Sequence, residues 1–202
     1  MGGTPNQEQG VDSLRRDVET AVGKVRENPV LRNFMDDPRT KTKVTAGSGE
    51  NFGEVYIMGQ EDASKFPKQN WIEIRNKGNI PLDKAITGEL MHAFGAEDLK
   101  GNPQHPEFFS LKQEFIGNMT QEQLGIMDRQ FKALQQKGGT GLNSQDIGHF
   151  LKNSFSDSEI RGHLFPEVMT DPKERELFRS GVLLSPRQRE IIMQMKQIIG
   201  VQ

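Results

Sequence analysis

Apolar residues recur at steps of three and four along most of this 202-residue chain, and that spacing is the period of an amphipathic α-helix. The first such run ends at Asn28-Pro29, because proline disfavours helical geometry in the residue before it. A short apolar turn is expected between Val30 and Met35. The first run is carried by Val11, Leu14, Val18, Val22 and Val25. The period predicts that helices make up most of the fold.

Helix signals dominate from residue 80 onward. A helix is expected from near Leu82 to about Phe94, after the breaker at Pro81. Thr120 followed by Gln123 has the spacing of a capping box, in which each residue bonds the backbone N–H of the other. Ser185-Pro186 has the order of a cap followed by proline at the first helical position. Further helices are expected to open at Ser144 and Asp171, so the C-terminal half is predicted to be helical.

Two segments before residue 80 are typical of strands. Residues 52–58 (FGEVYIM) and 71–75 (WIEIR) are rich in β-branched and aromatic side chains, and the second alternates apolar with polar residues. A third, shorter strand is expected near Val44. The predicted fold class is therefore α+β, mainly α-helical, with a small antiparallel sheet of two or three strands followed by a helical C-terminal half.

This pattern predicts three regions along the chain. Residues 1–10 carry no apolar side chain after Met1 and are expected to be a flexible arm. Residues 11–100 should hold the first helix, the small sheet and the helix that follows it. Residues 101–202 should form a helical region.

Composition excludes several classes of function. Lys and Arg number 26 against 28 Asp and Glu, a net charge of −2, so no global charge favours nucleic acid or an anionic membrane. The absence of cysteine excludes disulfides, cysteine zinc sites and thiol chemistry. No run of 18 apolar residues is present, so no segment is expected to span a membrane. Without the basic start and apolar middle of a secretory signal, the protein is expected to be cytoplasmic as synthesised.

One helix carries residues with the spacing of a chemical site. In TGELMHAFGAED, residues 87–98, Glu89 lies three residues before His92. Residues three and four apart share one face of a helix. The helix resembles that of a zincin metalloprotease, whose His-Glu-x-x-His motif places two zinc ligands and a general base on one face. Glu89 and His92 match the base and the second ligand, and Gly88 stands where the first ligand would be.

The resemblance continues beyond the helix. Metzincin-type zincins follow the motif with a glycine and a third ligand, and Gly95 and Asp98 stand at those two spacings. The expected strand at 71–75 would provide the edge-like strand that precedes the zincin helix. The resemblance covers residues 71–98. It implies a zincin-like fold in which Glu89 is the catalytic residue and His92 and Asp98 are the metal ligands.

The substitution at Gly88 decides how this resemblance is interpreted. A zinc site needs three protein ligands in its usual form, and His92 with Asp98 makes two. The other donors nearby in the sequence are Glu97, His105, Glu107 and Glu114. We therefore expect a pseudo-enzyme without a cofactor. The alternative is an active zinc-dependent peptidase whose ligand set is completed elsewhere.

Other catalytic classes have weaker support. A glycosidase could use Glu89 or Glu114 as its acid, but no spacing singles out a second carboxylate. The chain has no Gly-x-Ser-x-Gly nucleophile elbow. Gly138, Gly139 and Gly141 lack the lysine of a phosphate loop and are interpreted as a linker between helices.

The last predicted helix offers a second kind of function. Its apolar stripe either packs on the protein's own core or forms a surface for a protein partner or for self-association. The stripe consists of Ile191, Ile192, Met195, Ile198 and Ile199. The combined interpretation is a non-catalytic structural or interaction protein on a pseudo-zincin fold. We expect it to be a component of a larger assembly such as a phage particle.

Overall fold

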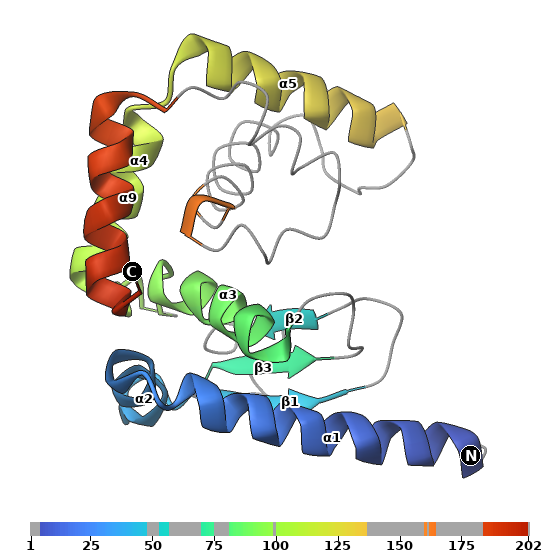
Figure 1. The fold of residues 1–202 in the computed structure, drawn as a ribbon. Coiled ribbons are helices and arrows are strands. Elements are labelled where there is room, and N and C mark those ends of the chain that lie inside the picture. Colours follow the sequence, from blue (N-terminus) through green and yellow to red (C-terminus); the bar gives the residue numbers. More distant parts are fainter. Residues whose placement is uncertain are drawn as a thin grey trace. The chain divides into compact units, whose positions relative to one another are not determined.

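A computed structural model describes residues 5–47, 53–56, 70–74, 81–98, 100–136, 160, 162–164 and 184–201. The fold is α+β and mainly α-helical, as the sequence predicts (Figure 1). The predicted helices that open at Ser144 and Asp171, and the linker at 138–141, lie outside the described residues. The elements are α1 (Pro5–Val25), α2 (Pro29–Asp36), β1 (Lys43–Ala46), β2 (Gly53–Tyr56), β3 (Trp71–Ile74), α3 (Leu82–Phe94), α4 (Pro106–Gly117), α5 (Gln121–Gln136) and α9 (Pro186–Ile199).

The chain divides into two compact units. The first unit is Met1–Phe109 together with Ile198–Gln202, and the second unit is Ser110–Gln197. The sequence predicts a boundary after residue 100, and the division between the two units falls within α4. The small sheet belongs to the first unit.

The sheet has three strands in the order β1-β3-β2, with β3 in the centre. β2 runs antiparallel to β3, as predicted, with Gly53 opposite Ile74. β1 runs parallel to β3, with Lys43 opposite Trp71, so the prediction of an antiparallel sheet is wrong for this pair. Strands that follow one another in sequence commonly pair as neighbours, but here β3 lies between β1 and β2. The segment 71–75, expected to be edge-like, therefore supplies the central strand.

Two helical predictions need correction at the N-terminal end. α1 begins at Pro5, so residues 5–10 are helical where a flexible arm was expected. Glutamine and glutamate favour helices, and extending a helix that has already formed costs far less than starting one. The apolar turn between Val30 and Met35 is part of α2, an eight-residue helix. Its Asn28 cap accepts hydrogen bonds from the backbone N–H groups of Val30 and Leu31.

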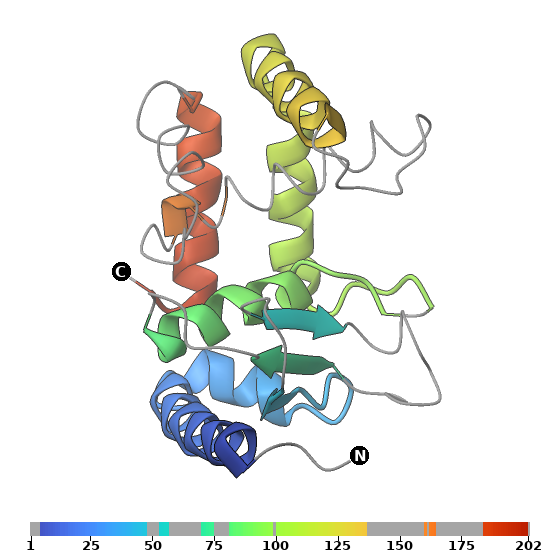
Figure 2. The same ribbon diagram turned by 90° about the vertical axis from the view of Figure 1, so that its right-hand side faces the viewer.

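The core of the first unit lies between two helices and the sheet. α1 and α3 lie side by side on one face of the sheet, in contact with each other (Figures 1 and 2). β3 contributes Ile72 and Ile74, both fully buried. An aromatic cluster extends this core, since the Phe94 ring of α3 lies 4.0 Å from Phe34 and 5.7 Å from Phe108. Buried side chains of the two helices include Leu14, Val18, Ala21 and Val25 of α1 and Ala85, Ile86, Leu90, Met91, Ala93 and Phe94 of α3.

The second unit contains two capped helix starts that pair with each other. The predicted capping box at Thr120 is confirmed, because the Thr120 N–H donates to Gln123 Oε1 and the Gln123 N–H donates to Thr120 Oγ1. Ser185 and Gln188 repeat the arrangement at the start of α9. The two glutamine side chains then exchange hydrogen bonds of 3.1 and 2.9 Å. Both glutamines are buried, so each satisfies the other's amide.

Candidate functional site

Helix α3 holds the two residues that carry the zincin resemblance. Glu89 and His92 are both half-buried on this helix, whereas Gly88 is buried. The helix ends at Gly95, whose φ of −85° is open to any residue. Buried residues lie on several sides of the α3 axis, and Gly88 is one of them. Position 88 is therefore a packing position in this structure.

Asp98 lies in a closed loop beyond the helix. Its Oδ1 accepts hydrogen bonds of 2.8 Å from the backbone N–H groups of Lys100 and Asn102. The Asn102 side chain donates to both carboxylate oxygens at 3.3 Å. These bonds, the Asn102 backbone N–H above all, lower the pKa of Asp98 because they favour its charged form. Gly101 turns the loop with a φ of +78°, where a side chain would be strained.

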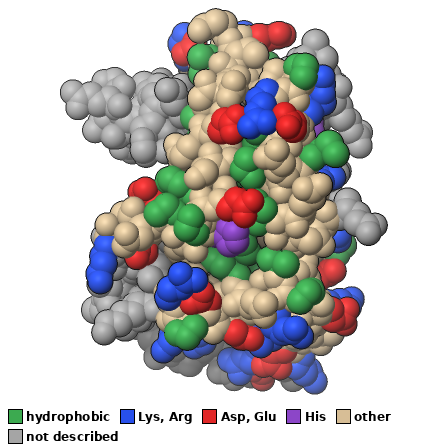
Figure 3. All heavy atoms as spheres, turned by 90° about the vertical axis from the view of Figure 1, so that its left-hand side faces the viewer, with side chains coloured by type: hydrophobic (Ala, Val, Ile, Leu, Met, Phe, Trp, Pro, Cys, Tyr) green, Lys and Arg blue, Asp and Glu red, His purple; other side chains and the backbone are tan. Residues whose placement is uncertain are grey.

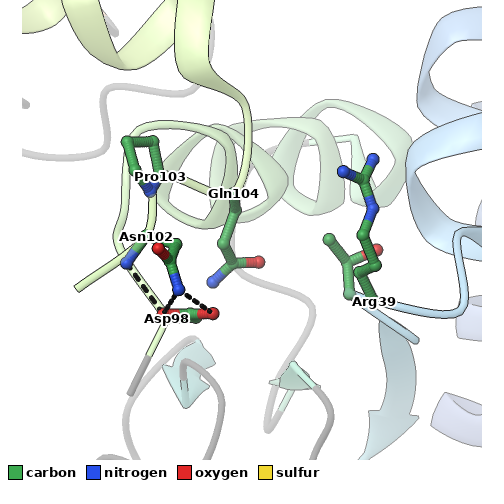
Figure 4. A pocket seen from close by; sticks show the side chains of 6 residues that line it. Arg39, Asp98, Asn102, Pro103 and Gln104 are labelled. Atoms are coloured by element: carbon green, nitrogen blue, oxygen red, sulfur yellow. Dashed lines mark hydrogen bonds between the residues drawn. The ribbon is translucent and has the colours of Figure 1, made fainter. Parts of the chain in front are cut away.

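A cavity of about 270 Å³ opens beside this loop. In Figure 4, Arg39 stands on one side of Gln104, and Asp98, Asn102 and Pro103 stand on the other. Thr40 completes the lining, but Glu89 and His92 are not part of it. The structure therefore places Asp98 and Arg39 around this cavity, without Glu89 and His92.

The other residues that the sequence offers as metal ligands lie outside this cavity. Glu97 forms an isolated β-bridge with Pro103, and Glu107 is exposed. In the second unit, Glu114 Oε1 accepts a 2.6 Å hydrogen bond from Arg187 Nε, which lowers the pKa of Glu114.

His105 caps the start of α4 in the first unit. Its Nδ1 accepts a 3.3 Å hydrogen bond from the Phe108 N–H, and its ring lies 5.0 Å from that of Phe94. Burial lowers the pKa of His105, which keeps the ring neutral. A neutral Nδ1 can accept the Phe108 bond, so this histidine has a structural role in the helix cap.

The described residues of the motif do not form a zinc site in this structure. Within the ranges that the structure describes, no group of three or more His, Asp or Glu side chains is placed to hold a metal. Gly88 supplies no donor atom, and the Asp98 carboxylate is engaged by the amides of its own loop. Ligands of a zinc site must instead converge on one point in tetrahedral geometry.

The polar residues around the cavity could not be predicted from the sequence. Asn70 and Gln104 exchange side-chain hydrogen bonds of 2.6 and 3.1 Å, although 34 positions separate them in sequence. Neither residue stands in a motif. The one local signal lies at Arg39, which follows Asp37 by two positions and pairs with it.

Hydrophobic side chains lie among polar and charged ones on the face of the molecule drawn in Figure 3. Acidic and basic side chains are interspersed over the face drawn in Figure 3. In α9, the stripe residues Ile191, Ile192 and Met195 are buried. Among the described residues, one large apolar side chain is exposed, that of Met193, with 62% of its surface accessible. These three residues of the stripe are therefore not part of an exposed surface in this structure. None of the described helices is both long and apolar enough to cross a membrane.

Comparisons of the chain with protein families, with curated proteins and with solved structures find no match. A proposal about its function therefore depends on the geometry of its own residues.

Proposed function

We propose that this chain is a non-catalytic structural or interaction protein built on a metalloprotease-like, pseudo-zincin fold. The order of elements supports the zincin-like part of the proposal. α3 follows β3 directly in the sequence of elements and contacts both β3 and β2. Four residues keep the spacing of the zincin pattern without its first ligand: Glu89, His92, Gly95 and Asp98.

The Asp98 loop is the observation that carries the non-catalytic part. The Asp98 Oδ1 already accepts bonds from Lys100 and Asn102, so this carboxylate is oriented by its own loop and would offer a metal its Oδ2 alone. Because Gly88 is buried and has no side chain, the helix keeps one imidazole of the motif, that of His92. Glu89 would then have no metal-bound water to activate. The motif positions thus serve packing and loop closure.

The interaction part of the proposal concerns the outer face of α9. Arg189, Glu190, Met193 and Gln197 are all exposed on this helix, and their spacing of three and four places them on one face. Opposite charges around one apolar side chain suit a protein partner or a second copy of the chain. A component of a larger assembly, such as a phage particle, would have such a face.

Zinc content tests the proposal directly. The full chain, purified without chelators, is measured by elemental mass spectrometry beside His92→Ala, with His105→Gln as the matched control. We expect no stoichiometric zinc in any of the three, and no peptide hydrolysis when zinc is added. One zinc per chain that is lost in His92→Ala but kept in His105→Gln would instead establish the zinc-peptidase alternative.

A further inference from the structure

One wall of the cavity beside the Asp98 loop carries a cation, the guanidinium of Arg39. Arg39 Nε donates to both carboxylate oxygens of Asp37, at 3.0 and 3.1 Å, and Arg39 Nη2 donates to Asp37 Oδ2 at 2.6 Å. The Arg39 side chain is 82% exposed, so this ion pair orients it without burying it. Nη1 takes no part in the pair. The guanidinium therefore presents a further N–H edge whose position is set by Asp37.

The opposite wall is a fixed anion. Asp98 Oδ1 is held by two backbone N–H groups, whereas Oδ2 accepts only the long 3.3 Å bond from Asn102 among the bonds of this loop. The side-chain oxygen of Asn102 takes no part in those bonds and is a further acceptor. Asp98 Oδ2 and the Asn102 oxygen can thus both receive hydrogen bonds from a ligand on this side.

Between the walls lies a rigid polar side chain. Gln104 is 9% exposed, and its amide is locked to Asn70, which is fully buried. The Asn70 backbone is in turn bonded to Thr40 and Lys43. Because these amides satisfy one another, Gln104 provides shape and keeps the two charged walls apart. A site whose charged groups are held by their own hydrogen bonds loses little entropy when a ligand binds.

We propose that this cavity binds a small zwitterion, a free α-amino acid, with its carboxylate on Arg39 and its ammonium group on Asp98 and Asn102. The volume of about 270 Å³ lies at the lower end of ligand pockets, which run from roughly 300 to 1,000 Å³. A dianion would meet the Asp98 carboxylate, and a simple cation would meet the Arg39 guanidinium. A molecule with both charges pairs with each wall. This site goes beyond the proposed function and does not depend on it.

The test titrates the ¹⁵N-labelled full chain and follows its NMR spectrum. The probes are L-alanine, N-acetyl-L-alanine, which lacks the ammonium group, and L-alaninamide, which lacks the carboxylate. L-Alanine is expected to move the side-chain signals of Arg39, Asn102 and Gln104 with a millimolar dissociation constant. Each derivative is expected to bind at least about tenfold more weakly. Equal binding of all three probes, or no saturable shift with L-alanine, would overturn the proposal.

Matched variants assign the binding to the two walls. Arg39→Gln removes the cation, and Asp98→Asn removes the negative charge while its oxygen can still accept the loop bonds. Both are expected to weaken L-alanine binding by about tenfold or more, with amide signals far from the cavity unchanged. Arg32→Gln, at an exposed arginine outside the cavity, should bind like the native chain. If Arg32→Gln weakens binding as much as Arg39→Gln does, the assignment to this cavity is wrong.

Discussion

Each compact unit contains a reciprocal pair of buried amides, but the two pairs are held in place differently. In the second unit, Gln123 and Gln188 each stand three residues after a helix cap and also accept a bond from the cap's backbone N–H. In the first unit, Asn70 directly precedes β3 and Gln104 lies in the loop before α4. Asn70 also donates to Thr42 Oγ1 at 3.3 Å.

This difference determines what each pair stabilises. A capping box is local, so each glutamine of the second unit already has a helix end that positions it. Their pairing joins two ends that would form in any case. Asn70 and Gln104 have no local motif, and their contact exists only when the sheet, the loop at Thr40 and the loop at Asp98 have assembled. We therefore expect the first pair to contribute more to the unfolding free energy than the second.

The largest effect is expected from Asn70→Ala. Gln104 would keep its buried amide but lose both bonds to Asn70, and an unsatisfied buried polar group costs about 1–3 kcal/mol. Because the bond to Thr42 is lost as well, we expect the unfolding free energy of the full chain, measured in urea, to fall by the upper part of that range. Asn118→Ala is the matched control, because Asn118 is exposed and bonds only its own helix end. If Asn70→Ala and Asn118→Ala lose the same unfolding free energy, the buried pair of Asn70 contributes no more than an exposed bond at a helix end.

A smaller effect is expected for the second pair. Gln123→Ala and Gln188→Ala should each cost about 1 kcal/mol, the lower end of the same range. The glutamine that remains still accepts a bond from the backbone N–H of its own cap, and the Thr120 and Ser185 hydroxyl groups can still cap the helices. The double variant measures the coupling, which we expect to be about 0.5–1 kcal/mol for two side chains in direct contact. Strict additivity would mean that the two amides do not exchange hydrogen bonds in solution.

The smallest effect is expected from protonation of His105. Its pKa is lowered from 6.5 in the folded chain, chiefly by burial, with a smaller opposing influence of Glu107 and a further lowering by Arg39. The unfolded state therefore takes up the proton first. Stability from the neutral ring is complete above pH 6.5 and is lost as the pH falls through the lowered pKa.

His105→Asn isolates this effect, since asparagine caps a helix without titrating. Urea midpoints of both proteins are compared at about pH 8 and about pH 5. The native chain should lose more stability than the variant over that interval. A larger loss in the variant would show that the Phe108 cap does not depend on the charge of the ring.

Local signals in the sequence predicted a good part of the fold. α3 was expected from Leu82 to Phe94, and it has those bounds. The capping box at Thr120 and the strand at Trp71 were also found. Each of these depends on residues within a few positions of one another. α2 was missed because Asn28-Pro29 was interpreted only as the end of a helix, although the same pair caps the next one.

Long-range geometry could not be predicted in this way. The parallel pairing of β1 with β3 depends on which strands become neighbours in space, and four-residue strands carry little information about that. Asp98 has the spacing of a third zinc ligand, but its role is set by Lys100 and Asn102, whose backbone N–H groups reach it only when Gly101 turns the loop. Spacing along a helix cannot report such a loop.

Zinc retention by Gly88→His tests most directly whether the motif positions serve packing and loop closure. The variant restores the missing ligand type four residues before His92, and Gly88→Ala is the control for adding a side chain at this buried position. We predict that the native chain and both variants hold no stoichiometric zinc after dialysis. We also predict that Gly88→His unfolds at lower urea than Gly88→Ala, because a large side chain overpacks the core. One zinc per chain in Gly88→His, lost again when Asp98→Asn is added, would contradict the account and show that Asp98 leaves its loop to bind metal.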